Sequence, residues 1–144
     1  MMASIVVDAN VAVKWLELFA KESLVREANQ LLARRVNLAV EMLVPDLFWP
    51  EVGSILWKAV RRNECTQEDA RASLSLLEDL HLQTVPSGSF IAPALEIAIR
   101  YGRSVYDSVY VAVARELGLE LVTADEKLAN ALTGHLPVKW LGAI

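Results

Sequence analysis

The stretch LVTADEKL, residues 121–128, holds the pattern from which the fold of this chain can be inferred. Its short apolar run, continuing into Ala124, predicts a buried strand, and a helical pattern begins directly after Asp125. The N-terminus repeats this arrangement, because IVV is followed by Asp8 and then by the helical pattern ANVAVKWL. Carboxylates at the carboxyl ends of parallel strands lie where open α/β sheets bind ligands. The two aspartates therefore predict one site, which the middle of the chain must complete.

Strands and helices alternate through the remaining sequence. We expect strands at residues 4–7, 42–44, 82–85, 121–123 and 138–140. We expect helices at residues 9–18, 22–40, 46–62, 66–80, 90–101, 105–117 and 126–132. This order predicts an α/β fold in one domain, residues 1–144, with a central parallel β-sheet flanked by helices on both faces.

Local residues mark several helix ends. Thr66 with Asp69 three positions later matches a capping box. Gly102 and Gly118 each follow a helical pattern and predict its end. Pro50 belongs in the first turn of its helix, so either Asp46 caps that helix or Pro50 is its first residue.

The composition argues against several classes of protein. The 144 residues are 54% hydrophobic and 22% charged, which excludes an intrinsically disordered chain. One cysteine and two histidines give no basis for a disulfide framework or a cysteine-rich zinc site. No apolar run reaches the roughly 20 residues of a membrane helix, and the N-terminus lacks the basic start of a signal peptide. We therefore expect a cytoplasmic protein that does not bind a membrane.

The formal net charge of −4 works against nucleic-acid binding through a basic surface alone. Such a function would need local basic residues, bound cations or a partner. Lys14, Arg100 and Arg103 lie near the expected site elements in the sequence and could meet phosphates. A solvated helix face is the simpler explanation for each of them.

Four carboxylates stand at the starts of helical patterns, and each has an ordinary structural explanation. Asp8 and Asp125 could each be the N-cap of a helix that follows a strand. Glu51 could be a first-turn acid that the helix dipole favours. The sequence SVYD places Asp107 three residues after Ser104, as in a capping box. Taken singly, these residues do not establish a functional site.

Taken together, the four carboxylates predict a metal site. Two of them follow strands and two begin apolar helices, and helix starts that follow parallel strands lie at one edge of the sheet. Carboxylates that converge there repel one another unless they are protonated or bridged by cations. Oxygen ligands suit Mg²⁺ or Mn²⁺. Such sites serve phosphoryl chemistry, in which the metal lowers the pKa of a water and stabilises the leaving oxygen.

Four segments in order, IVVDANVAVKW, PDLFWPEVGSIL, SVYDSVYVAVARELG and LVTADEKL, cover much of the chain. With these segments the chain resembles the PIN domain, and more narrowly the VapC-type ribonuclease toxins of prokaryotic toxin–antitoxin pairs. The resemblance implies a single PIN-like domain and an endoribonuclease that depends on Mg²⁺ or Mn²⁺. The family's acidic metal ligands fall here on Asp8, Glu51, Asp107 and Asp125, and its assisting polar residues on Asn10 and Thr123.

The resemblance also implies three partners. These are an RNA substrate, a cognate VapB-like antitoxin that inhibits the active site, and a second copy in a homodimer. The first part of the chain is rich in aromatic residues, among them Trp15, Phe19, Trp49 and Trp57. Most of them are expected in the core, but an exposed patch built from them would suit an amphipathic helix of the antitoxin.

Two other functions stay open on the sequence. A non-catalytic PIN-like interaction module would use the same acids to cap helices or to bind the arginines of a partner. A metal-dependent phosphatase would act on small phosphate esters instead of RNA. The chain has no G-x-S-x-G motif, P-loop or Rossmann fingerprint, so these motifs support no further class of enzyme.

Overall fold

The computed structural model describes residues 3–37 and 40–144, and in these ranges it contains one five-stranded parallel sheet. The strands are β1 (Ala3–Val7), β2 (Val40–Pro45), β3 (Gln83–Val85), β4 (Glu120–Thr123) and β5 (Val138–Trp140). The α-helices are α1 (Ala9–Ala12), α2 (Val25–Val36), α3 (Phe48–Arg61), α4 (Gln67–Glu78), α5 (Ile91–Tyr101), α6 (Val105–Leu117) and α7 (Glu126–Leu132). Short 3-10 helices are η1 (Val13–Trp15), η2 (Glu17–Phe19), η3 (Ser87–Phe90) and η4 (Leu141–Ala143). The expected α/β fold is confirmed.

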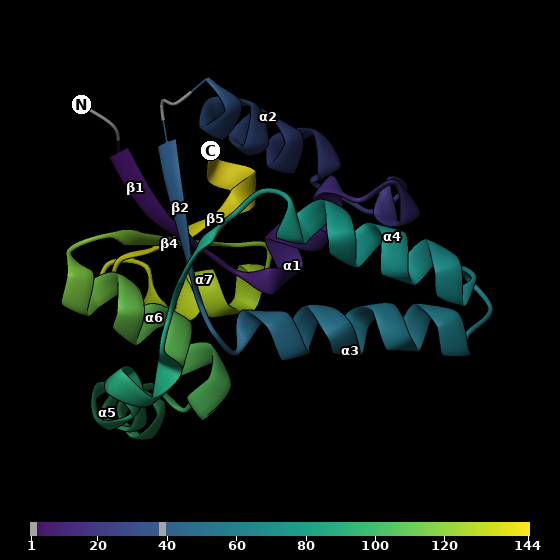
Figure 1. Ribbon diagram of the computed structural model, residues 1–144. Coiled ribbons are helices and arrows are strands. Elements are labelled where there is room, and N and C mark those ends of the chain that lie inside the picture. The colour runs from purple at the N-terminus through teal and green to yellow at the C-terminus, as the bar shows by residue number, and fades with distance from the viewer. Residues whose placement is uncertain (1–2, 38–39) are drawn as a thin grey trace.

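The strand order β3-β2-β1-β4-β5 places β1 at the centre of the sheet, paired in parallel with β2 and β4. The chain runs from β1 outward to β2 and β3, and then returns to the other side of β1 as β4. Right-handed crossovers then place α2 and α6 on opposite faces, as Figure 1 shows. The strand order reverses beside β1, and in such sheets ligands bind at this point, outside the carboxyl ends of the strands.

Helix α6 is the main cover of the sheet and packs on β1, β2 and β4. Its residues 108–114 are all buried, because the helix lies between the sheet on one side and α5 on the other. The central strands supply the matching surface, with Val6, Val7 and Leu121 fully buried. No helix in residues 3–37 and 40–144 is long and apolar enough to span a membrane.

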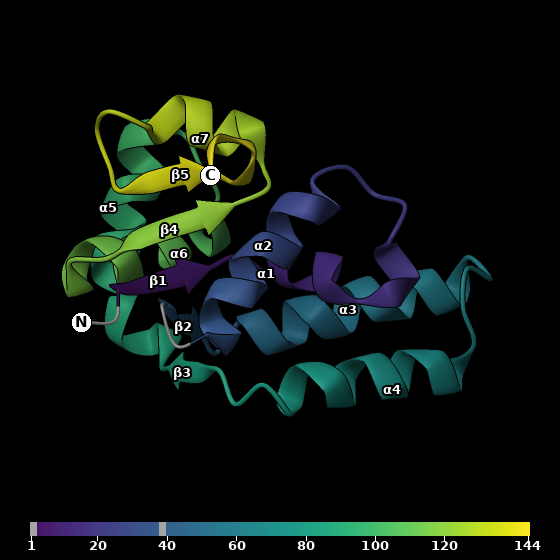
Figure 2. The same cartoon turned by 90° about the horizontal axis from the view of Figure 1, so that it is seen from above.

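Helices α3 and α4 lie side by side and extend away from the sheet, as Figures 1 and 2 show. The turn between them ends in the predicted capping box. The Thr66 hydroxyl accepts a hydrogen bond from the backbone N–H of Asp69, and the Asp69 carboxylate accepts one from the N–H of Thr66, each at 3.1 Å. These two bonds satisfy N–H groups that the helix itself leaves unpaired.

The helices predicted at residues 9–18 and 22–40 are wrong in extent. The first is interrupted at Leu16, which is extended and buried, while the Trp15 indole donates a hydrogen bond to the Ala28 carbonyl at 2.8 Å. The second begins only at Val25 and ends at Val36. Val40 belongs to β2 because it pairs with β1, and residues 38–39 lie outside the described residues.

The start of α3 also differs from both predicted alternatives. Leu47 is the N-cap, and Pro50 is the third residue of the helix, still within the first turn. Asp46 does not cap the helix, since its carboxylate accepts a hydrogen bond from the backbone N–H of Ser87 at 3.0 Å. This bond joins the ends of β2 and β3, a long-range contact that the local sequence did not indicate.

Two glycines in this fold predict opposite effects of one substitution. Gly118 ends α6 with φ of +68°, so Gly118→Ala should lower the free energy of unfolding by about 1 kcal/mol. Gly53 lies inside α3 with nothing within 4 Å of an added Cβ, so Gly53→Ala should raise it by about 0.5–1 kcal/mol. Urea unfolding of both variants tests the pair, and effects of equal sign would contradict the assigned backbone conformations.

Candidate acidic site

Asp8 is the most deeply buried acid of the site, with 6% of its surface exposed. It follows β1, and its backbone N–H donates to the carbonyl of Val122 on β4 at 3.1 Å. Burial raises the pKa of the Asp8 carboxyl to about 7; the hydrogen bond from Thr123 opposes this shift, and the charges of Glu51 and Asp107 add to it. At neutral pH this carboxyl is therefore poised between its protonated and ionised forms.

Thr123, at the end of β4, connects the two strand ends through its hydroxyl group. The hydroxyl donates to Asp8 Oδ2 at 2.9 Å. It accepts from Asn10 Nδ2 at 3.3 Å and from the backbone N–H of Asp125 at 3.1 Å. Thr123 is completely buried, so these bonds form in a low-dielectric environment where they fix geometry strongly.

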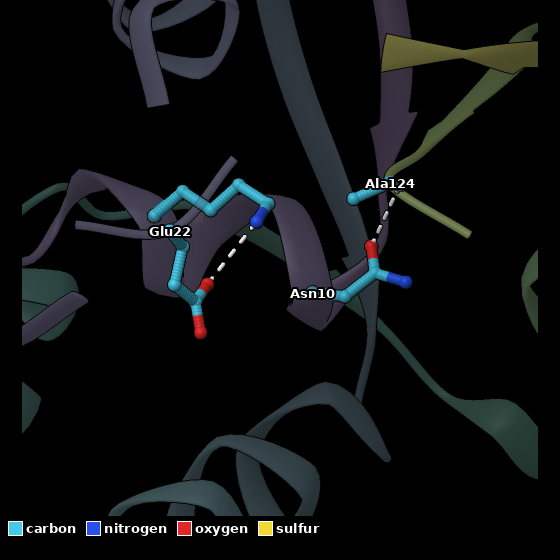
Figure 3. Close-up of polar contacts among 4 residues, drawn as sticks. Asn10, Glu22 and Ala124 are labelled. Atoms are coloured by element: carbon cyan, nitrogen blue, oxygen red, sulfur yellow. Dashed lines mark hydrogen bonds and ion pairs between the residues drawn. The ribbon is translucent and has the colours of Figure 1, made fainter. Parts of the chain in front are cut away.

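The side chain of Asn10 bridges the same two strand ends. Its Oδ1 accepts a hydrogen bond from the backbone N–H of Ala124 at 3.0 Å, as Figure 3 shows. Its backbone N–H contacts Asp8 Oδ1 at 3.5 Å. The Asn10 side chain is thus directed toward β4, where it holds Thr123 and the following backbone in place.

Asp125 is the N-cap of α7, as its ordinary structural explanation predicts. Its Oδ1 accepts a hydrogen bond from the backbone N–H of Leu128 at 3.1 Å. One carboxylate oxygen is therefore committed to the helix end. The charge of Asp125 still raises the pKa of the neighbouring Asp107 carboxyl, which places Asp125 within electrostatic reach of the other acids.

Asp107 lies in the first turn of α6, and its backbone N–H donates to Ser104 Oγ at 3.0 Å. Within the described chain, the reciprocal bond that would complete the capping box is absent. Burial raises the pKa of the Asp107 carboxyl, Ser104 and Arg103 oppose this shift, and Asp125 adds to it. The Asp107 carboxylate therefore contributes to the site and is not used up by the helix cap.

Glu51 stands in the first turn of α3 and is half-buried. Its Oε1 is buried without a hydrogen-bond partner in the described structure. Burial raises the pKa of the Glu51 carboxyl; the adjacent Tyr110 hydroxyl lowers it, and the charge of Asp107 raises it further. A buried carboxylate oxygen without a partner is costly, so this atom is suited to a cationic ligand.

These contacts define the acidic site, Asp8, Glu51, Asp107 and Asp125, as a set of carboxylates whose ionisations oppose one another. Among the described residues, no three aspartate, glutamate, histidine or cysteine side chains are arranged to hold one ion together. Binding of one metal by several of these acids would therefore need changes of rotamer, or water molecules between acid and metal. The oxygen-only donor set fits Mg²⁺ or Mn²⁺.

Two more residues lie at this site: Tyr110, for which the sequence indicated no role, and Arg103, for which a solvated helix face was the simpler explanation. Tyr110 is 1% exposed, and among the described residues its hydroxyl has no hydrogen-bond partner. Burial raises the pKa of its phenol, and the charges of Asp8 and Glu51 raise it further. Its position one helical turn after Asp107 was the available signal. Arg103 lies close enough to Asp107 to lower the pKa of its carboxyl.

Most of the aromatic residues in the first part of the chain lie in the core or pack against it, as expected. Trp15 is tied to α2, and the Trp49 indole donates a hydrogen bond to Thr84 Oγ1 at 3.2 Å. Phe19 is half-buried against the core. Trp57 is different, with 55% of its surface exposed and the Arg61 guanidinium 5.1 Å from its ring centroid.

Known proteins resemble this chain in sequence and in fold. Ribonuclease VapC3 of Pyrobaculum aerophilum is 32% identical over 106 residues, which cover 72% of this chain and 81% of that protein. The crystal structure of PAE2754 from the same organism superposes with a TM-score of 0.70 at 21% identity, covering 99% of this chain and 85% of that one. A Mycobacterium tuberculosis structure described as VapBC-5, of the VapBC family of toxin–antitoxin systems, has a TM-score of 0.57 at 20% identity, covering 96% and 97%.

The sequence itself matches the PIN domain family over residues 5–131, a span that contains all four acids of the acidic site together with Asn10 and Thr123. The chain therefore belongs to the PIN domain family.

Proposed function

We propose that this protein is a divalent-metal-dependent endoribonuclease and the toxin of a toxin–antitoxin pair. The observation that carries the proposal is the acidic site itself, four mutually opposing carboxylates near the carboxyl end of β1. A relative that is 32% identical is named a ribonuclease, and membership of the PIN domain family supports the same reading.

Asp8, Glu51, Asp107 and Asp125 would hold Mg²⁺ or Mn²⁺, directly or through water. The unpartnered Glu51 Oε1 and the buried Asp8 carboxyl fit this role, because a cation offsets charges that are otherwise unfavourable there. When bound, the metal would supply Lewis acidity to a phosphodiester and an activated water for its hydrolysis.

The remaining residues would fix the positions of these acids. Thr123 donates to Asp8 Oδ2 and so sets the orientation of that carboxylate. Asn10 holds Thr123 from the other side. Asp125 uses Oδ1 for the α7 cap, which leaves Oδ2 for the site. Rigid support of this kind keeps ligands in a productive geometry with little reorganisation.

A groove between α3 and α4 supports the expectation of an antitoxin. Its volume is about 350 Å³, and it is lined mainly by apolar side chains of both helices, which suits the apolar face of an amphipathic helix. The protein described as VapBC-5 belongs to a toxin–antitoxin family. The apolar side chains that line the groove include Leu56, Trp57, Val60, Ala70 and Leu74.

Helix α5 supports the expectation of a homodimer. Ile91, Leu95 and Ile99 follow one another at four-residue spacing and are 45%, 49% and 75% exposed. An apolar stripe of this kind is unfavourable in water and suits a second copy of the same helix. We expect the dimer to act in the cytoplasm, where its RNA substrate would be found.

A non-catalytic interaction module is the second candidate, because Asp8 and Asp125 both accept hydrogen bonds that cap helices. It differs from the nuclease in one respect that can be measured. If the protein is an interaction module, replacing one of the acids would not change how the protein responds to added metal.

Asp8→Asn and Asp107→Asn should each reduce RNA cleavage more than about 100-fold, because each removes a charged ligand from one shared metal site. Asp79→Asn, on the exposed end of α4, is the matched control and should cleave like the wild type. Cleavage is followed on labelled RNA with Mn²⁺, and Mn²⁺ binding by calorimetry. Full metal-dependent cleavage by both site variants would contradict the assignment.

The buried carboxyl of Asp8 predicts how stability depends on pH without metal. Its pKa is about 7 in the folded protein, against the ordinary value of 3.8, so the folded state holds the proton more tightly. The protonated Asp8 carboxyl therefore makes its full contribution to the free energy of unfolding below about pH 4. This contribution is lost as the pH rises to about 7, and the loss is on the order of 4 kcal/mol.

Asp8→Asn removes this dependence, so the variant should gain stability over the wild type as the pH rises from about 4 to about 7. Urea unfolding in EDTA at several pH values measures the difference. A stability difference that stays constant with pH would mean that the Asp8 pKa is not raised.

Ile99→Asp should convert the dimer to a monomer, because it places a charge in the middle of the proposed interface. Val36→Asp, on α2 and 67% exposed, is the control and should leave the mass unchanged. Light scattering after gel filtration gives the mass, for which one chain contributes 15.9 kDa. A monomeric wild type would refute the dimer.

A further inference from the structure

The acidic site creates an electrostatic problem for the proposed substrate. An RNA strand carries a negative charge on each phosphate, and the protein itself has a net charge of −4. Bound metal offsets part of the repulsion at the reacting phosphate, but the neighbouring phosphates still need cationic groups. Such a group must lie beside the acidic site and must not already be neutralised by an ion pair.

Arg103 lies at this place because of the turn between α5 and α6. Gly102 ends α5 in the left-handed conformation with φ of +67°, and Ser104 is the N-cap of α6. Ser104 Oγ accepts from the backbone N–H of Asp107 at 3.0 Å. The turn is therefore fixed on both sides of Arg103, directly before the helix turn that carries an acid of the site.

Arg103 has no ion pair in the described part of the chain, although it lies near Asp107. It is half-buried, and its Nε is buried without a hydrogen-bond partner among residues 3–37 and 40–144. A buried guanidinium nitrogen that lacks an acceptor is unfavourable, so the free protein leaves this side chain incompletely satisfied.

Two of the other basic residues near the site in sequence, Lys14 and Arg100, are already engaged. Lys14 is buried and forms an ion pair with Glu22 at 3.1 Å, which Figure 3 shows. Arg100 lies over the Tyr101 ring, 5.6 Å from its centroid, on the exposed side of α5. Arg103 thus combines a position beside the acidic site with unused hydrogen-bonding capacity.

We infer that Arg103 binds a backbone phosphate of the RNA strand next to the reacting phosphate and so holds the strand across the acidic site. A guanidinium suits this task, since its planar set of N–H donors matches two phosphate oxygens and stays charged at every physiological pH. The inference rests on the proposed function and assigns to it a substrate-binding residue.

The test is RNA binding measured by fluorescence anisotropy, using a fluorescein-labelled pool of single-stranded 20-nucleotide RNAs of random sequence. Ca²⁺ replaces Mg²⁺, and the RNA is checked to be intact after each titration. Affinity is measured over a range of KCl concentrations for the wild type, Arg103→Gln, Arg103→Lys and Arg100→Gln. Mn²⁺ affinity and urea unfolding are measured on the same proteins.

Arg103→Gln should weaken RNA binding about tenfold and reduce the slope of log affinity against log salt by about 0.7, the value for one lost contact with a single strand. Arg103→Lys should keep the salt slope while losing part of the affinity, because the charge remains but the two-oxygen contact does not. Arg100→Gln should bind like the wild type, and none of these variants should change Mn²⁺ affinity.

Unchanged affinity and salt slope in Arg103→Gln would overturn this inference and leave the proposed function standing. A loss of Mn²⁺ affinity or stability with an unchanged salt slope would overturn it too, because Arg103 would then serve only as a counterion for Asp107. Failure of the wild type to bind or cut RNA would overturn both the inference and the proposed function.

Discussion

The burial of the Asp8 carboxylate at the end of the central strand is the constraint on which the rest of the site depends. β1 lies between β2 and β4, so the residue that follows it is enclosed on several sides. Burial alone raises the cost of ionising this carboxyl, and the nearby charges of Glu51 and Asp107 raise it further. The fold therefore maintains an unfavourable concentration of negative charge that a divalent cation would relieve.

A hydrogen-bond network around Thr123 keeps this arrangement in place. The Thr123 hydroxyl joins Asp8, Asn10 and the backbone of Asp125, which come from the ends of β1 and β4. Asp8 and Asp125 also have a local structural task, as the N-caps of α1 and α7. Structural and functional explanations of the acids are therefore compatible, since a capped helix start is what holds a carboxylate at the edge of the sheet.

The surroundings of the acidic site divide into parts with different chemistry. The groove between α3 and α4 and the stripe on α5 are apolar and lie on other elements. Arg103 and Tyr110 belong to the site itself, one as a cation beside Asp107 and the other as a buried phenol beside Glu51. The acidic site, the apolar groove and the apolar stripe thus lie on different elements of one small fold.

The sequence by itself determined the elements whose signals are local. The bounds of α6 and α7 and of β5 agree with the prediction, because glycine stops, capping residues and apolar spacing act within a few residues. The four acids could be nominated in the same way, as residues at strand and helix ends. Only the tertiary structure decided which contacts they make. The bond between Thr123 and Asp8 joins residues 115 positions apart, and the break at Leu16 depends on packing against the core. That Arg103 has no ion pair with any described residue likewise depends on which side chains the folded chain brings near it, and no local pattern encodes that.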